Sequence, residues 1–154
     1  MRGLVVGLAA LLLAAPAVAQ TRFVATVTGT GPDVVLIPGL ASSDDVWDAT
    51  VRQLSPTHRV HTLQVKGFAG EPAGPNAEGP FLAPLVEEVA AYAAALGKPA
   101  IVGHSLGGLT AIEVAAKHPE AVGRVMIVDA LPFYALIFMP NATAETVKPQ
   151  AEMM

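Results

Sequence analysis

One serine of the chain lies between glycines in a pattern that could support nucleophilic chemistry. Residues 103–107 read Gly103-His104-Ser105-Leu106-Gly107, which matches G-x-S-x-G. This pattern is typical of a sharp turn between a strand and a helix that projects the serine hydroxyl, and the flanking glycines let the two elements approach closely. Because Gly and Ser are common, the bare pattern arises by chance in roughly one chain of this length in twenty. The interpretation therefore depends on the elements around the motif.

The elements that the motif requires are predicted on both sides of it. Residues 100–102 are an apolar run typical of a buried strand, and residues 106–118 have a helical pattern that Pro119 ends. Gly108 extends the run of small residues and would let the helix pack tightly against a sheet. We therefore expect Ser105 to lie in a nucleophile elbow, with a structural glycine turn as the alternative.

Strand and helix patterns alternate along the rest of the chain. The strand patterns occupy residues 23–28, 34–37, 59–65, 100–102 and 125–128. The helical patterns, with their capping residues, occupy residues 42–54, 81–96 and 106–118, and a Gly- and Pro-rich stretch at residues 66–80 predicts an irregular loop. This alternation predicts an α/β fold with a mostly parallel sheet flanked by helices.

The first nineteen residues have the pattern of a secretory signal peptide. Arg2 supplies a positive charge, residues 4–15 are apolar, and residues 17–19 (Ala-Val-Ala) are the small residues that a signal peptidase requires. An uncleaved membrane anchor is the alternative, but the apolar run is shorter than the roughly 20 residues that cross a bilayer. We expect cleavage after Ala19, contact with a membrane only during export, and a periplasmic or secreted protein.

Composition excludes several other functions. The chain has 154 residues, of which 53% are hydrophobic, a formal net charge of −4 and no cysteine. These values indicate one folded domain at residues 20–154 rather than a disordered chain, and exclude disulfides and thiol catalysis. Without a basic cluster we expect no nucleic-acid partner. Four histidines without paired spacing lead us to expect no metal and no cofactor.

Three segments of the sequence resemble the α/β-hydrolase family. They read VVLIPGL at residues 34–40, IVGHSLGG at residues 101–108 and RVMIVDALP at residues 124–132. The resemblance covers nearly all of residues 20–154 and implies an α/β-hydrolase fold that acts on a small-molecule acyl substrate, an ester by default. It implies that Ser105 attacks the substrate carbonyl, while the backbone amides of Leu40 and Leu106 hold the oxyanion. The sequence departs from the family at Gln64, where an Asp is frequent.

The resemblance also implies a histidine base, and the sequence offers none in a suitable place. The family order is Ser, then acid, then His. The histidine that follows Ser105 is His118, about 20 Å away at the far end of the predicted helix. His58 and His61 fall at the start and middle of a strand, whereas sites in parallel sheets form at the carboxyl ends. His104 adjoins the nucleophile, so we expect its ring to point elsewhere and to pack.

Asp129 is the candidate acid. It directly follows the strand pattern at residues 125–128 and therefore falls at the sheet end where catalytic residues gather. Members of the family place the acid more often after a later strand, so a structural or pocket residue is the alternative interpretation of Asp129.

The end of the sequence indicates a fold that is incomplete at the C-terminus. Residues 140–154 resemble the start of a cap region, in which Thr143 could cap a helix. The later strands and the histidine of the family have no counterpart here, which leaves the strand at residues 125–128 as an unpaired apolar edge. We expect the N-terminal part of a longer exported serine hydrolase. A non-catalytic binding module and a membrane-tethered hydrolase are the alternatives, and nothing in the sequence indicates an oligomeric state.

Overall fold

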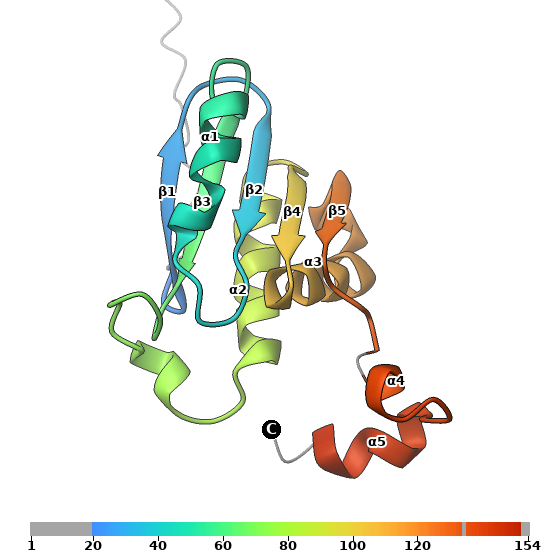
Figure 1. The fold of residues 1–154 in the computed structure, drawn as a ribbon. Coiled ribbons are helices and arrows are strands. Elements are labelled where there is room, and N and C mark those ends of the chain that lie inside the picture. The colour runs from blue at the N-terminus through green and yellow to red at the C-terminus, as the bar shows by residue number, and fades with distance from the viewer. Residues whose placement is uncertain (1–19, 134, 152–154) are drawn as a thin grey trace, which may run out of the picture.

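A five-stranded, mostly parallel sheet forms the centre of the chain (Figure 1). The computed structural model describes residues 20–133 and 135–151, so the predicted signal peptide at residues 1–19 lies outside the described residues. The strands are β1 (Phe23–Thr28), β2 (Asp33–Ile37), β3 (Arg59–Val65), β4 (Ala100–His104) and β5 (Arg124–Val128). They are ordered β1-β3-β2-β4-β5, and β1 alone among them runs antiparallel to its neighbour, β3.

Helices cover both faces of this sheet (Figure 1). The short 3-10 helix η1 (Asp44–Trp47) and α1 (Asp48–Leu54) lie on one face, and α2 (Leu82–Ala95) and α3 (Leu106–Lys117) lie on the other. The remaining elements are η2 (Gly74–Ala77), η3 (Pro119–Ala121), α4 (Ala135–Phe138) and α5 (Ala144–Ala151). The predicted α/β fold is confirmed.

The apolar run of β2 explains why the sheet is buried on both sides. Successive side chains of a strand point to opposite faces. Accordingly Val34 and Leu36 pack with Trp47 under α1, while Val35 and Ile37 pack against α2 and α3. A strand covered on both faces has no position for a polar side chain between these residues, which is why the sequence reads as continuous apolar residues.

Small differences from the predicted elements have local causes. The helix predicted at residues 42–54 begins as the 3-10 turn η1, in which Ser43 Oγ accepts a hydrogen bond from the Asp45 amide. The loop predicted at residues 66–80 contains the 3-10 turn η2, with Pro75 in its first turn. β4 continues to His104, because it pairs with β5 as far as Val128.

The open edge of the sheet is β5. Within residues 20–133 and 135–151, β5 pairs with β4 on one side only. Val125 is 37% exposed and Met126 is 61% exposed. The unpaired apolar edge expected from the sequence is therefore present in the described part of the chain. Among the same residues, no helix has both the length and the apolar character needed to cross a membrane.

A polar network ties β2, β3 and α2 together at the amino end of the parallel strands. The carboxylate of Asp33 accepts hydrogen bonds from Arg59 Nε at 2.5 Å and from Arg59 Nη2 at 2.8 Å. His61 Nε2 lies 2.7 Å from Asp33 Oδ1, and His61 Nδ1 lies 2.7 Å from the Tyr92 hydroxyl. The Arg59 guanidinium holds the pKa of Asp33 below its ordinary value; burial opposes this shift and His61 adds to it.

Replacing Asp33 should make the free energy of unfolding less dependent on acid pH. Asp33→Asn should cost about 1–2 kcal/mol at neutral pH, because Arg59 and His61 lose a charged partner. Folding lowers the pKa of Asp33, so the wild-type contribution is complete above the ordinary value of 3.8 and is lost as the pH falls through the lower folded-state value. Urea unfolding from about pH 7 to pH 2.5 measures both effects.

The exposed pair of Glu113 and Lys117, 2.7 Å apart on α3, supplies the control. Glu113→Gln should change the free energy of unfolding by no more than about 0.5 kcal/mol. If Asp33→Asn lost stability below pH 4 as steeply as the wild type, Asp33 would not be the group responsible.

Candidate active site

Ser105 lies on a strained turn between β4 and α3. Its backbone angles are φ 51° and ψ −115°, a conformation that residues other than glycine rarely adopt. The Ser105 amide donates a 3.0 Å hydrogen bond to the Val128 carbonyl of β5, and the Ser105 carbonyl accepts one from the Leu109 amide of α3. The predicted strand, turn and helix are thus present, and the turn is fixed to both of its neighbours.

Glycines in and beside the motif permit this turn, because a side chain at any of these positions would clash with neighbouring atoms. A Cβ on Gly103 would lie 2.1 Å from the Gly107 carbonyl oxygen, and a Cβ on Gly107 would lie 2.2 Å from the Ile37 carbonyl oxygen. A Cβ on Gly108 would lie 2.6 Å from that of Ala130. The first turn of α3 therefore packs directly on the end of β2 and on the segment that follows β5.

The two amides expected to hold an oxyanion lie on either side of this contact. Leu106 is the first residue of the twelve-residue helix α3, so its N–H has no partner within the helix and points along the positive end of the helix dipole. Leu40 follows Gly39 in the loop after β2, and a Cβ on Gly39 would lie 3.4 Å from the Ser105 Cβ. The Leu40 side chain is 59% exposed.

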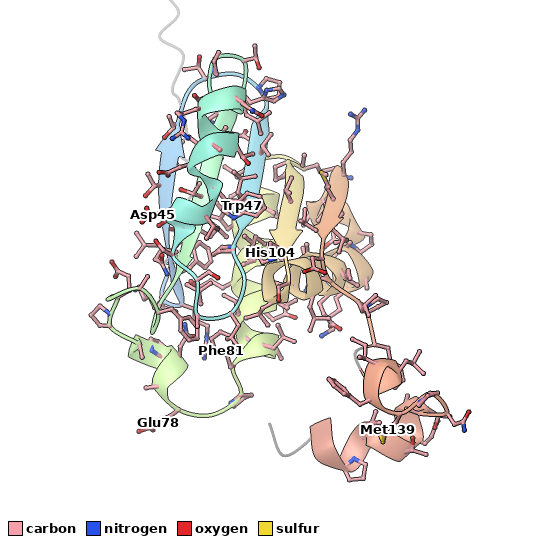
Figure 2. All side chains as sticks on the ribbon, in the orientation of Figure 1. Asp45, Trp47, Glu78, Phe81, His104 and Met139 are labelled. Atoms are coloured by element: carbon pink, nitrogen blue, oxygen red, sulfur yellow. The ribbon has the colours of Figure 1, made fainter. Side chains whose placement is uncertain are left out.

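His104 packs beneath the same loop. A Cβ on Gly39 would lie 3.1 Å from His104 Nδ1, so the ring and the loop are in close contact. The side chain is half-buried near the carboxyl ends of β2 and β4 (Figure 2). The ring therefore lies against the loop that also approaches Ser105.

Asp129 lies directly beside the elbow. It follows Val128, whose carbonyl accepts the Ser105 amide, and it has a left-handed φ of 48°. His104 pairs with Val128 at the ends of β4 and β5, so Ser105 and Asp129 are the first residues after two neighbouring strands. Its side chain is exposed at the carboxyl end of the sheet.

The other three histidines lie away from this end of the sheet. His61 is buried, with Asp33 and Tyr92 on its two ring nitrogens. His118 follows α3 at the end opposite Ser105, and its Nε2 lies 3.0 Å from Glu87 Oε2 without hydrogen-bond alignment. His58 contacts the neighbouring Thr57 hydroxyl before β3. Across the described ranges, no group of three or more His, Cys, Asp or Glu side chains could hold a metal ion.

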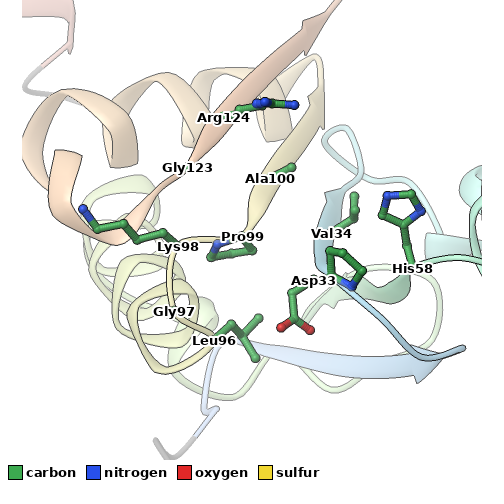
Figure 3. A pocket seen from close by; sticks show the side chains of 11 residues that line it. Asp33, Val34, His58, Leu96, Gly97, Lys98, Pro99, Ala100, Gly123 and Arg124 are labelled. Carbon is green, nitrogen blue, oxygen red and sulfur yellow. The ribbon is translucent and has the colours of Figure 1, made fainter.

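A separate hollow of about 430 Å³ lies at the opposite end of the sheet (Figure 3). Asp33, His58, Lys98 and Arg124 line it, all of them at or before the amino ends of strands. Asp33 is already paired with Arg59 and His61. In open parallel sheets the reactive groups gather at the carboxyl ends, where Ser105 and Asp129 lie. We therefore assign the candidate site to the elbow and not to this hollow.

Comparison with known proteins identifies the class of fold. The family model described as alpha/beta hydrolase fold matches residues 32–152. A solved carboxylesterase of the ammonia-oxidizing thaumarchaeon Nitrososphaera gargenis has the same fold, with a TM-score of 0.67 and 22% identity over 88% of this chain and 52% of that chain. The chain belongs to the α/β-hydrolase fold family.

More similar sequences are named as esterases or lipases. The pimeloyl-[acyl-carrier protein] methyl ester esterase of Aeromonas hydrophila subsp. hydrophila is 36% identical over 107 residues, which are 69% of this chain and 41% of the relative. A solved bacterial membrane phospholipase A is 29% identical, with a TM-score of 0.63 over 71% of this chain and 36% of that one. The chain thus spans less than half the length of these relatives.

A methyl group at Gly107 should destabilise the fold more than one at a glycine in open space. Gly107→Ala should lower the free energy of unfolding by about 3 kcal/mol, because the clash is with backbone and cannot be relieved by a rotamer change. Gly97→Ala is the control: no atom lies within 4 Å, and φ of +78° should cost about 1–2 kcal/mol. Chemical denaturation measures both. Equal costs would mean that the close approach of α3 to β2 is not required.

Proposed function

We propose that this chain supplies the nucleophile and the oxyanion hole of an exported serine hydrolase that acts on an ester or a related acyl substrate. The observation that carries the proposal is the backbone of Ser105, which has a φ of 51° between β4 and α3. The close contacts around Gly103 and Gly107 leave no room for a side chain at either glycine and so hold this turn in place. Strain of this kind at an accessible hydroxyl is typical of a nucleophile elbow.

In the proposed reaction, Ser105 Oγ forms a bond to the substrate carbonyl carbon while a base removes its proton. The carbonyl oxygen becomes negatively charged and accepts hydrogen bonds from the Leu40 and Leu106 amides. Each such donor typically contributes a factor of about 10² to 10³ to the rate. The dipole of α3 adds to this stabilisation, because its positive end is at Leu106.

The base of the proposed reaction is a histidine outside this sequence. Three of the four histidines, His58, His61 and His118, have partners remote from Ser105, and the ring of the fourth, His104, lies against Gly39. We propose that a segment following Met154 supplies the histidine, with Asp129 as the candidate acid or as a pocket residue beside it. Sequencing the gene beyond the codon for Met154 tests this part of the proposal. It is contradicted if the in-frame continuation is about as long as the unmatched part of a relative and encodes no histidine.

The proposed substrate class rests on the family and on an exposed apolar segment that follows β5. The relative from Aeromonas hydrophila is named as a methyl ester esterase, which makes a carboxylic ester the first choice. Beyond the carboxyl end of β5, the segment around α4 exposes a group of large apolar side chains: Leu131, Leu136, Ile137, Phe138 and Met139. Folded over Ser105, this apolar segment would favour an apolar acyl group or alcohol.

The complete product of the gene should react covalently at Ser105. A fluorophosphonate probe should label the wild type, because phosphonylation uses the same nucleophile, base and oxyanion hole. Ser105→Ala should abolish labelling and lower ester hydrolysis by at least about 10³-fold. Ser55→Ala, at the end of α1, should leave both unchanged. Absence of labelling in the folded wild type would instead favour a non-catalytic binding module.

Export is the second part of the proposal. The first residues after the predicted cleavage site are held in the fold, since Glu88 of α2 accepts hydrogen bonds from the Thr21 and Arg22 amides at 2.6 Å and 2.9 Å. The fold thus already includes Thr21 and Arg22, which supports the proposal of a leader that ends at Ala19.

The mature protein from the native host should begin at Gln20. Mass spectrometry of its N-terminal peptide measures this directly, and cell fractionation should place the protein in the periplasm or the medium. A mature chain that retained residues 1–19 in the membrane fraction would contradict cleavage and favour the membrane-tethered alternative. Ala19→Pro is a suitable companion variant, because the altered cleavage site should cause the uncleaved precursor to accumulate.

A further inference from the structure

Gln64 connects three backbone segments at the carboxyl end of β3. Its side chain is buried, and its Oε1 accepts a 2.9 Å hydrogen bond from the Asp44 amide at the start of η1. Its Nε2 donates to the Val65 carbonyl at 3.0 Å, and it lies 3.4 Å from the Ser42 carbonyl and 3.5 Å from that of Phe68. One side-chain amide thus contacts the loop after β2, the end of β3 and the loop after β3.

These contacts need a side chain that both donates and accepts. A glutamine amide has two N–H donors and one carbonyl acceptor, whereas a carboxylate only accepts. A carboxylate at position 64 could keep the bond from the Asp44 amide. It would, however, place negative charge against the carbonyl oxygens of Ser42, Val65 and Phe68. Because position 64 has Gln where the family frequently has Asp, its side chain can bind backbone carbonyl oxygens as well as a backbone amide.

The loop held by Gln64 is the one that presents the Leu40 amide. The Ser42 amide donates to the Gly39 carbonyl at 3.3 Å, which closes a tight turn around Leu40 and Ala41. Ala41 has a φ of 57°, so the turn is kept in a conformation that an alanine disfavours. Gln64 contacts the residues at the exit of this turn, Ser42 and Asp44, and so opposes its relaxation.

We propose that Gln64 is a positioning residue for the oxyanion hole: its amide fixes the exit of the 39–42 turn and thereby the direction of the Leu40 N–H beside Ser105. This inference rests on the proposed function, because it assigns Gln64 an effect on the same reaction. Gln64 does not touch the substrate. It acts on transition-state stabilisation through the loop, so its loss should affect kcat more than KM.

The test uses the complete gene product and the isosteric variant Gln64→Glu. We expect kcat for an activated ester to fall by about 10- to 100-fold, with KM changed by no more than about threefold, and the rate of fluorophosphonate labelling to fall in parallel. Asp44→Pro is the second variant. It removes the N–H that donates to Oε1 at the first position of a helical turn, where proline is tolerated. It should lower kcat in the same direction.

Asn76→Asp is the matched control for these variants. The Asn76 amide joins backbone segments in the same way, accepting from Arg22 Nη1 at 2.8 Å and donating to the Arg22 and Lys66 carbonyls at 2.9 Å and 3.0 Å. None of these groups belongs to the loop at residues 38–44. Asn76→Asp should therefore lower the melting temperature without changing kcat by more than about twofold.

The outcomes separate this inference from the proposed function. Wild-type protein that is not labelled at Ser105 contradicts the proposed function, and the role of Gln64 fails with it. Labelled wild type with unchanged kcat in both folded variants overturns the role of Gln64 alone. An equal loss of kcat in Gln64→Glu and Asn76→Asp, in proportion to their melting temperatures, also overturns it. If Gln64→Glu does not fold, the kcat of Asp44→Pro decides whether Gln64 positions the loop.

Discussion

The close approach of α3 to the sheet is the contact on which the candidate site depends. With no side chain at Gly103 or Gly107, the helix begins directly on the carbonyl oxygen of Ile37 at the end of β2. This contact places Ser105 at the junction of β4, α3 and the loop after β2, and it directs the free amides of the first helical turn toward the same space. A larger residue at either glycine would move the helix away from the loop after β2 and disturb the turn at Ser105.

The polar interactions of the domain are divided between the two ends of the sheet. At the amino end, Asp33, Arg59, His61 and Tyr92 form a network that joins strands to α2 and uses both nitrogens of a buried histidine. At the carboxyl end, the polar groups are mostly backbone amides and carbonyls, with the amide of Gln64 holding the loop. The side-chain network at the amino end is thus built on titratable groups, whereas the Gln64 amide holds backbone groups of the loop at the carboxyl end.

Local patterns in the sequence were sufficient to predict the five strands, helices α1 to α3 and the turn at Ser105, but not the short helix α4. Each of these depends on neighbours within a few residues, such as the apolar run of β2 or the glycines around Ser105. The contacts of Gln64 could not be predicted in this way, because its partner Asp44 is twenty residues away and the two meet only after β2 and β3 have paired. The left-handed turn at Ala41 has no sequence signal either, since alanine disfavours it. The departure from the family at Gln64 was visible, but its consequence depended on the fold.

The open edge of the sheet and the candidate site share one strand. β5 accepts the Ser105 amide through Val128 and is followed directly by Asp129, yet it pairs with β4 alone among the described strands. Fraying of this edge would therefore loosen the turn at Ser105 as well as expose apolar surface. A further strand paired in parallel with β5 would cover this edge and would end at the carboxyl end of the sheet, where Ser105 and Asp129 lie.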